Sequence, residues 1–300
     1  MNSHNNRDSG LKQPPKTMHH IVALRDELRK FREDKRIALV PTMGNLHDGH
    51  VSLVEIAKKH ADIVVVSIFV NPTQFGEGED FDSYPRTLEA DVSRLTLAGA
   101  DIVFAPSVEE IYPNSPSEIS TSIDLGTMTK HLCGKSRPGH FDGVGLVVSK
   151  LFNIVQPDVA VFGKKDYQQL ALIRQLTEDL SYPIEIIRAP IVRTEDGLAL
   201  SSRNQYLTES ERQLAPKLHQ IIYDLSKKIE RGEHIVIGFE ELLNKSCQRI
   251  NAAGFEVDYL QIMTQKLGPA TKADKELVIL VAAWLGKARL LDNQEVIVDI

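Results

Sequence analysis

The sequence of 300 residues predicts an α/β protein with a doubly wound parallel sheet and a second, smaller α+β domain. From residue 20 onward, stretches with apolar residues at helical spacing alternate with short apolar, β-branched runs. This alternation is typical of βαβ units and therefore of a parallel sheet covered by helices on both faces. After Arg188 the alternation gives way to a polar, hairpin-like stretch and long charged helices, which indicates a different domain.

The elements of the first domain are expected from their own apolar patterns. Helices are predicted where apolar residues recur every three or four positions, at residues 20–33, 49–60, 85–97, 144–155 and 166–180. Strands are predicted where apolar, often β-branched residues run consecutively, at residues 37–40, 63–70, 101–104, 159–162 and 184–187. Because the two kinds of element alternate, the strands are expected to form a parallel sheet.

The second domain is expected to combine helices with short strands. Residues 194–207 form a polar, hairpin-like stretch, after which Thr208 and Glu211 fit a capping box at a helix N-terminus. Pro216 should break or kink the helix that begins there, because proline lacks the backbone N–H. The remaining predicted elements are a helix over residues 239–253 and short strands over residues 255–262, 277–283 and 288–291.

Composition and charge narrow the class of protein. The net charge of −6 gives no basic field that would attract nucleic acid or an anionic membrane, so an anionic substrate must meet a local cluster of cations. The longest apolar runs, such as residues 277–285, fall short of the ~18 residues that a membrane-spanning helix needs. We therefore expect a protein that binds neither nucleic acid nor membrane.

The cysteines and the first residues favour a particular compartment. Cys133 and Cys247 lie far apart without CxxC spacing, so neither a disulfide framework nor a structural zinc site is expected. A reducing, cytoplasmic location is the simple interpretation. Residues 1–17 are polar and lack the apolar core of a signal peptide, so we expect a disordered leader before a domain that opens near Met18.

Two familiar phosphate-binding motifs are excluded by direct reading. Residues 134–136 (GKS) resemble the end of a P-loop, but that motif requires glycine where Thr129 stands. Residues 143–145 (GVG) begin like a dinucleotide fingerprint, yet Val148 occupies the third glycine position and no strand precedes the segment. Neither segment is expected to bind a nucleotide.

A pair of histidines follows the first predicted strand, at a helix N-terminus. Residues 41–50 read PTMGNLHDGH, which places His47 and His50 on one face of the first helical turn. The unpaired N–H groups and positive dipole of a helix N-terminus suit phosphate, and the imidazoles add hydrogen-bond donors. Gly44 and Gly49 let the backbone approach a ligand closely. The arrangement would stabilise charge that develops on phosphate oxygens as a nucleoside triphosphate is split.

Taken singly, these motifs also fit plainer interpretations. An isolated HxGH is more often a polar surface turn, and a metal site would need a third ligand that is not near in sequence. Lys164 and Lys165 open a predicted helix and can reach phosphate, although a lysine pair is usually a solvated helix face. Residues 200–204 (LSSRN) read by themselves as a polar hairpin. Several such features nevertheless fall at the carboxyl ends of predicted strands, where doubly wound sheets bind ligands.

Taken together, the motifs identify a family. The chain closely resembles pantothenate synthetases (pantoate–β-alanine ligases) in the ordered segments PTMGNLHDGH, NPTQFG, YPRT, RPGHFDGV, FGKKDYQQLALIRQL, DGLALSSRNQYL and VAAWLGKARLLDN, and the likeness extends from about Met18 to Ile300. The resemblance implies that ATP and pantoate give pantoyl adenylate and pyrophosphate, after which β-alanine attacks to yield pantothenate and AMP. It also implies Mg²⁺ with the ATP and a cytoplasmic homodimer. The implied fold is a Rossmann-like nucleotide-binding domain, residues 18–188, and a smaller domain, residues 189–300, that closes over the site.

The resemblance further implies the site residues, position by position. His50 stands where the family has its proton donor, with His47 beside it, and Lys165 and Arg203 would steady the triphosphate as further catalytic residues. The positions that match ATP contacts are Met43, Gly44, Asn45, Leu46, His47, Asp48, Gly49, His50, Gly163, Lys164, Lys165, Asp166, Val192, Leu200, Ser201, Ser202 and Arg203. The positions that match pantoate contacts are Gln74 and Gln169, with Asn71, Tyr84 and Arg137 expected near them.

The chain departs from the family pattern at two places. Lys164 stands where glutamate is common, which is expected to add positive charge near the phosphates without removing Lys165. Some members place two acidic residues and a glutamine near the metal, where this chain has Ala90, Asp91 and Arg94. Since only Asp91 is retained, no protein ligand is assigned to Mg²⁺.

Two other functions compete with the ligase. A nucleotidyltransferase would share the HxGH site but retain the nucleotidyl group in its product, whereas a ligase releases free AMP after the amine has added. A catalytically silent nucleotide-binding protein could keep the same fold. The retention of the histidine pair, Lys165 and Arg203 argues against loss of activity.

Overall fold

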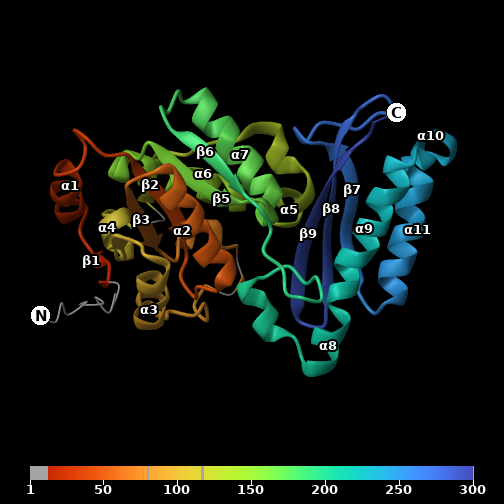
Figure 1. The fold of residues 1–300 in the computed structure, drawn as a ribbon, viewed down its shortest axis with the longest axis horizontal. Helices are drawn as coiled ribbons and strands as arrows, with labels where there is room; N and C mark the ends of the chain where they lie inside the picture. Colours follow the sequence, from red (N-terminus) through yellow and green to blue (C-terminus); the bar gives the residue numbers. More distant parts are fainter. Residues whose placement is uncertain (1–12, 77, 80, 116–117, 300) are drawn as a thin grey trace, which may run out of the picture.

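The computed structural model describes residues 13–76, 78–79, 81–115 and 118–299, which contain two sheets (Figure 1). The first sheet is parallel, in the order β1-β4-β3-β2-β5-β6. Its strands are β1 (Lys16–Met18), β2 (Ile37–Thr42), β3 (Ile63–Ile68), β4 (Ile102–Phe104), β5 (Val159–Gly163) and β6 (Glu185–Ala189). The predicted parallel sheet is therefore confirmed.

The predicted disordered leader needs a correction at its end. Residues 1–12 of the leader lie outside the described residues. Lys16 and Thr17, however, lie in β1 and pair in parallel with Ile102 and Val103 of β4, so the expected boundary at residue 17 is wrong for these two residues. The short polar strand has no apolar pattern of its own, and it forms because a distant strand supplies partners for its backbone.

Helices cover both faces of the first sheet. One face packs against α1 (Ile21–Arg29), α6 (His140–Val155) and α7 (Tyr167–Asp179), and the other against α2 (Asp48–His60) and α3 (Leu88–Ala98). Alternate side chains of β2 divide between the two cores, since Leu39 packs in the first and Val40 in the second. The short helices α4 (Val108–Ile111) and α5 (Leu132–Ser136) were not predicted from the apolar pattern.

The last third of the chain combines helices with an antiparallel sheet. Its elements are α8 (Glu209–Leu214), α9 (Pro216–Glu230), α10 (Glu233–Ile237), α11 (Phe239–Ala252), β7 (Glu256–Thr264), β8 (Glu276–Leu285) and β9 (Ala288–Ile297). The capping box of Thr208 and Glu211 is confirmed, and Pro216 separates α8 from α9 as predicted. β9 continues past the predicted end at residue 291, because its polar second half keeps pairing with β8 as far as Ile297.

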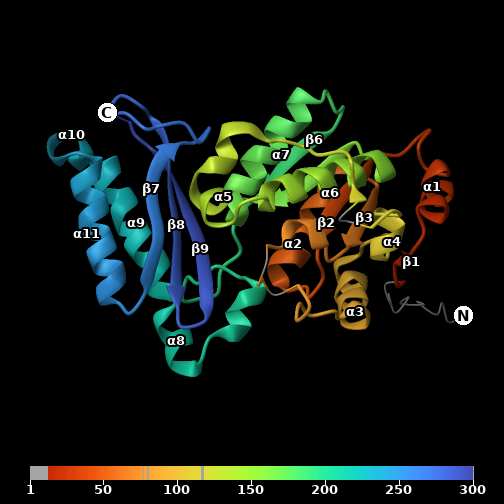
Figure 2. The ribbon, with the colours of Figure 1, turned by 180° about the vertical axis from the view of Figure 1, so that it is seen from behind.

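Both faces of this second sheet are covered. Figures 1 and 2 show it standing between α9 and α11 on one side and the first part of the chain on the other. Ile279 of β8 packs in the cluster that contains the apolar residues of α9 and α11, whereas its neighbours Val278 and Leu280 pack with Leu132 and Tyr167. The second sheet is thus held against the first part of the chain by apolar contacts. None of the helices in the described ranges has the length and apolar character needed to cross a membrane.

Candidate active site

A cleft of about 950 Å³ opens at the carboxyl ends of the parallel strands. Its floor lies at β2 and β5, which are neighbours in the sheet although the chain leaves them toward opposite sides. Such a reversal of strand order creates the crevice in which doubly wound sheets bind ligands. The second sheet closes the far wall with side chains of β7, β8 and β9. The volume lies in the range of pockets that enclose a cofactor-sized ligand.

The sequence-predicted residues converge on this cleft. Those that line it are Met43, His47, Gly49, His50, Gln74, Gly163, Lys165, Asp166, Gln169, Val192, Leu200, Ser201, Ser202 and Arg203, together with Asn71, Tyr84 and Arg137. Those predicted to contact ATP that are not among the lining residues are Gly44, Asn45, Leu46, Asp48 and Lys164. Segments more than 150 residues apart in sequence therefore share one cavity, as between His47 and Arg203.

The two histidines of the HxGH motif organise each other at the N-terminus of α2. Nδ1 of His47 accepts the N–H of Gly49 at 3.1 Å, and Nδ1 of His50 accepts the N–H of His47 at 3.2 Å. The rings lie 4.1 Å apart between centroids. Because a backbone N–H can only donate, each neutral ring must carry its proton on Nε2. Both imidazoles are thereby prepared as hydrogen-bond donors for an anionic ligand.

Burial keeps both imidazoles neutral. Burial, with a smaller contribution from the charge of Lys165, lowers the pKa of His47 from 6.5 to about 4. Burial, the neighbouring His47 and Lys165 lower the pKa of His50 to about 3. Near pH 7 the free protein therefore presents two neutral donors beside the positive charge of Lys165. Neutral rings avoid repelling that lysine before an anion arrives.

Glycine is required at two places around the motif. A Cβ on Gly49 would lie 2.8 Å from Cε1 of His47, so the ring can pack over the helix start only if residue 49 has no side chain. Gly44 has φ of +81°, in the left-handed region, and a Cβ there would approach Asp91 Oδ2 at 3.1 Å. The turn before α2 therefore depends on Gly44, and the packing of His47 over the helix start depends on Gly49.

Asp91 holds the turn before α2. Its side chain is buried, and it accepts the N–H groups of Asn45 and Leu46 at 3.0 and 2.7 Å and the hydroxyl of Thr87 at 3.1 Å. Both carboxylate oxygens are thus engaged by the protein. Within the described ranges, no three His, Cys, Asp or Glu side chains come together in a way that could hold a metal ion.

The turn after β5 presents one lysine to the cleft and turns the other away. Lys164 and Lys165 belong to the 3₁₀ turn η4 (Lys164–Asp166), and Lys165 lies 3.4 Å from the carboxylate of Asp166. Burial raises the pKa of Asp166, but the positive charges of Lys165 and Arg203 outweigh it, so the net pKa lies below its ordinary value. Lys165 and Asp166 consequently face the cleft as an ion pair.

Lys164 has a partner on β9 that the sequence did not predict. Its ammonium group donates to Oε2 of Glu295 at 2.5 Å, and Glu295 also pairs with Arg188. Lys164 is not among the residues that line the cleft, and its ammonium pairs with a carboxylate of β9 that it shares with Arg188. The sequence could not show this partner, which lies 131 positions away.

The loop before α8 carries the remaining phosphate candidates. An isolated antiparallel bridge between Arg193 and Ala199 confirms the hairpin-like turn, in which Gly197 has φ of +97°. At its end Ser201 Oγ accepts the N–H of Arg203 at 3.3 Å and starts the 3₁₀ helix η5 (Ser202–Tyr206). Both side chains line the cleft.

A polar network supports Gln74, which also lines the cleft. Oε1 of Gln74 accepts the amide of buried Asn71 at 3.1 Å, and Asn71 also donates to the carbonyl of Gly143 at 3.2 Å. A Cβ on Gly143 would lie 2.1 Å from the carbonyl oxygen of Thr73, so α6 can pack against the 3₁₀ turn η1 (Pro72–Gln74) only through glycine. The rejected GVG motif is therefore a packing site.

Two residues of this wall were not assigned from the sequence. Glu79 accepts two hydrogen bonds from Arg137, at 2.7 and 2.5 Å, and these lower its pKa to about 2. His140 donates from Nδ1 to the carbonyl of Gln74 at 2.7 Å and accepts from Arg137 at Nε2. Burial and the charge of Arg137 lower the pKa of His140 to about 4. His140 belongs to the RPGH segment, which was the available signal.

Comparisons with known proteins agree over nearly the whole chain. The family model for pantoate-beta-alanine ligase matches residues 16–295. A pantothenate synthetase from Psychrobacter sp. (strain PRwf-1) is 63% identical over 284 residues, covering 93% of this chain and 98% of the relative. The crystal structure of pantothenate synthetase from Thermus thermophilus is similar with a TM-score of 0.85 and 42% identity, covering 93% of this chain and 98% of that one.

A third relative was solved with ligands. The crystal structure of a pantoate-beta-alanine ligase from Francisella tularensis, described as complexed with beta-gamma ATP and beta-alanine, has a TM-score of 0.77 and 36% identity. The match covers 93% of this chain and 97% of that chain. The two-sheet architecture described above is therefore shared with solved members of one enzyme family.

Proposed function

We infer the chemistry of the cleft from one premise, namely that the chain belongs to the pantoate–β-alanine ligase family. It is a ligase that forms pantothenate from pantoate and β-alanine with ATP. We propose that the cleft runs this reaction through pantoyl adenylate. The observation that supports this most directly is the convergence of His47, His50, Lys165 and Arg203 in one cavity with Gln74 and Gln169.

In the first proposed step, a carboxylate oxygen of pantoate attacks the α-phosphorus of ATP. The bond between the α-phosphorus and the bridging oxygen to the β-phosphate breaks, and pyrophosphate leaves with that oxygen. An anion thus attacks an anion, so the site must neutralise phosphate charge and align the reactants. Lys165 and Arg203 would supply fixed positive charge, while the Nε2–H groups of His47 and His50 would donate to phosphate oxygens from the start of α2.

The amide side chains would hold the small acid. An amide can donate to the carboxylate of pantoate and accept from its hydroxyls without adding charge. Gln74 is oriented for this task because Asn71 fixes its Oε1 and the Nε2 of Gln74 lies 3.1 Å from the sulfur of Met43. Gln169, on the first turn of α7, lines the same cleft.

The second proposed step needs less from the protein. The neutral amine of β-alanine attacks the acyl carbon of pantoyl adenylate, the bond from that carbon to the phosphate oxygen breaks, and AMP leaves while the amine loses a proton. The acyl group is already activated, so correct placement of the two reactants can supply much of the acceleration. The apolar and polar side chains of the second sheet would exclude water that competes with the amine.

Mg²⁺, a homodimer and a cytoplasmic location complete the proposal. Asp91 is engaged by backbone N–H groups, so the described residues do not fit a metal cage built by the protein. We propose that Mg²⁺ arrives on the phosphates of ATP and keeps its remaining ligands as water. Light scattering of the purified chain would test the dimer, and it would contradict the dimer by giving the mass of one chain.

One assay tests the proposed reaction. Purified protein is incubated with ATP, Mg²⁺, pantoate and β-alanine, and AMP, pyrophosphate and pantothenate are measured while each substrate is omitted in turn. Pantoate-dependent exchange of pyrophosphate into ATP without β-alanine, with AMP release only when β-alanine is present, is the expected result. A product that retains the nucleotidyl group would instead support a nucleotidyltransferase.

A further inference from the structure

The β9 strand carries two buried polar residues that the proposed chemistry leaves unused. Asp292 and Asn293 are 5% and 4% exposed in the middle of a strand whose other buried residues are apolar. Burying an amide or a carboxylate costs free energy unless its hydrogen bonds are restored. These two side chains must therefore be held for a structural or functional reason, and their partners indicate which.

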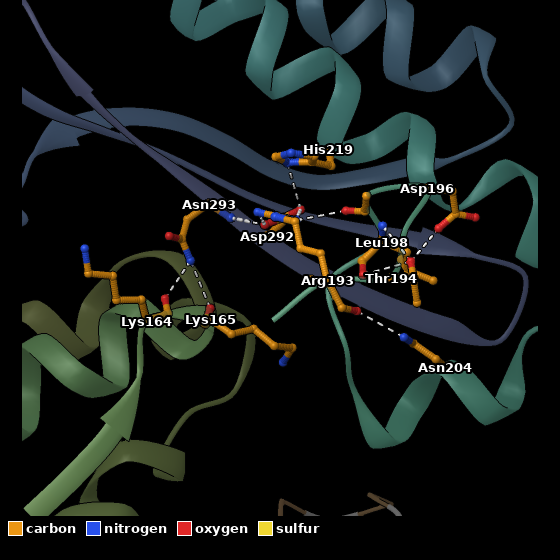
Figure 3. Close-up of polar contacts among 12 residues, drawn as sticks. Lys164, Lys165, Arg193, Thr194, Asp196, Leu198, Asn204, His219, Asp292 and Asn293 are labelled. Atoms are coloured by element: carbon orange, nitrogen blue, oxygen red, sulfur yellow. Dashed lines mark hydrogen bonds and ion pairs between the residues drawn. The ribbon is translucent and has the colours of Figure 1, made fainter. Parts of the chain in front are cut away.

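Asn293 reaches the phosphate lysine. Its Nδ2 donates to the carbonyl oxygen of Lys164 at 2.8 Å and to that of Lys165 at 3.0 Å, so both hydrogens of the amide are used on consecutive peptide groups (Figure 3). Carbonyl oxygens only accept, so the nitrogen of the amide must face them. The contact comes from the second sheet and falls on the turn that starts α7.

The same turn sends its two side chains in opposite directions. In Figure 3, Lys164 and Lys165 leave the turn on opposite sides. Lys164 is taken by Glu295, which lies on the same face of β9 as Asn293, and Lys165 lines the cleft. If the backbone of this turn rotated, Lys164 could point into the cleft in place of Lys165. The two hydrogen bonds from Asn293 to the backbone of the turn oppose that rotation.

Asp292 anchors the strand at this point. Its carboxylate accepts hydrogen bonds from both terminal nitrogens of Arg193, at 2.7 and 2.8 Å, and from the backbone N–H of Asn293, at 2.8 Å (Figure 3). His219 of α9 lies 3.5 Å from the same carboxylate. Arg193 opens the loop that carries Ser201 to Arg203. Adjacent residues of β9 thus contact two of the three segments that are proposed to bind phosphate, the turn of Lys165 and the loop that Arg193 opens.

We propose that Asn293 is a positioning residue for adenylate formation, which fixes the Lys164–Lys165 turn so that Lys165 faces the triphosphate. The inference rests on the proposed role of Lys165. It makes placement of that lysine dependent on the docked second sheet, because the two hydrogen bonds exist only when β9 lies against η4. Misplacement of a charged group by about 1 Å lowers the rate of a reaction by up to ~10²-fold.

A double-mutant cycle on pantoate-dependent ATP–pyrophosphate exchange tests the proposal. Asn293→Ala is expected to lower exchange at saturating ATP about tenfold while the dissociation constant of pantoate stays unchanged. Lys165→Ala alone is expected to lose ~10²–10³-fold. In the double variant the Asn293 substitution should add no further loss, because it acts through a lysine that is gone.

Two further variants keep the result decisive. Asn293→Ser retains one donor and should lose less than Asn293→Ala, and it replaces that variant in the cycle if Asn293→Ala fails to fold. Asn251→Ala makes the same change on the exposed last turn of α11, far along the chain from the turn, and should match wild type. Thermal unfolding of every variant checks that the fold is retained.

The opposing outcomes are distinct. Multiplication of the two single losses in the double variant, or wild-type exchange in Asn293→Ala, would overturn the positioning role. Wild-type exchange in Lys165→Ala would instead remove the proposed role of the lysine itself. A parallel weakening of pantoate binding in Asn293→Ala would also count against positioning, since it would indicate general damage to the cleft.

Discussion

The N-terminus of α2 and the middle of β9 border the same cleft but are organised over different distances. At α2, the bonds that orient the imidazoles of His47 and His50 run between residues two or three positions apart. At β9, Asp292 and Asn293 bond to residues 99 to 129 positions away. The first segment carries its geometry in its own sequence, whereas the second acquires its geometry only when two sheets meet.

This difference separates two kinds of contribution to activity. Groups at α2 and η4 are proposed to touch the phosphates, so their loss removes stabilisation of developing charge. Side chains on β9 are proposed to act through the residues that they position. Their loss should therefore make the position of Lys165 less well defined without removing its charge. We therefore expect large effects on rate from the first kind and moderate effects from the second.

The largest effect is expected from the groups proposed to contact phosphate. His50→Ala or Lys165→Ala should lower pantoate-dependent ATP–pyrophosphate exchange by ~10²–10³-fold, the scale of losing one charge-stabilising donor. The expected loss for Asn293→Ala on β9, about tenfold, is ~10–100 times smaller. Wild-type-like exchange in both variants would show that these residues do not take part in the mechanism. It would also contradict the expectation that groups in contact with phosphate contribute more to the rate than groups on β9.

The next effect is expected at the acid subsite. Gln74→Ala should weaken pantoate binding about 10–100-fold, because a hydrogen bond to a charged group contributes about 1.5–3 kcal/mol. Binding of ATP should change much less. Separate calorimetric titrations of the two ligands measure this, with Gln213→Ala on exposed α8 as the matched control. Equal weakening for both ligands would contradict the assignment of Gln74.

A pair of glycine substitutions compares local and distant packing directly. In Gly143→Ala the new Cβ meets backbone atoms of Thr73 and Gln74, which cannot move freely, so the free energy of unfolding should fall by about 1–3 kcal/mol. In Gly49→Ala the Cβ meets the ring of His47, which can rotate, so stability should fall less while exchange activity falls. Urea unfolding and the exchange assay on both variants measure the two effects. A larger stability loss in Gly49→Ala would contradict this reasoning.

The smallest expected effect is on the pH dependence of the free energy of unfolding, to which His50 of α2 and Asp292 of β9 should contribute in different pH ranges. His50 has a native pKa of about 3 against 6.5 in the unfolded chain, so the unfolded state binds a proton that the native state does not between these values. The free energy of unfolding should therefore be highest above pH 6.5 and should fall by on the order of 1 kcal/mol by pH 5.5 through this residue. Urea unfolding at pH 7.5 and 5.5 should show a smaller fall in His50→Gln.

The carboxylate of Asp292 on β9 should not contribute to the change in the free energy of unfolding between pH 7.5 and 5.5. Burial raises the pKa of Asp292, but the nearby His219 and the hydrogen bonds from Arg193 outweigh it and keep the net pKa below its ordinary value of 3.8. Its contribution to stability is therefore complete above that value and is lost only as the pH falls further. Because His219 lies beside this carboxylate, the test is made in a His219→Ala background, where a slope between pH 7.5 and 5.5 that Asp292→Asn alters would contradict this assignment.

The sequence by itself determined the features that depend on near neighbours. The helix and strand patterns predicted the parallel sheet, because apolar periodicity records which face of each element is buried. The capping box before α8 and the break at Pro216 were likewise predictable, since each involves only a few consecutive residues. The HxGH motif predicted a helix N-terminus for the same reason.

Only the tertiary structure decided the contacts between distant segments. β1 forms by pairing with β4, Lys164 turns to Glu295, Asp91 closes the turn before α2, and Asn293 holds the turn before α7. No local pattern encodes these contacts, because a hydrogen bond between distant residues depends on where the whole chain places its donor and its acceptor. The sequence supplied the chemical groups of the cleft, and the fold decided which distant segments meet around it.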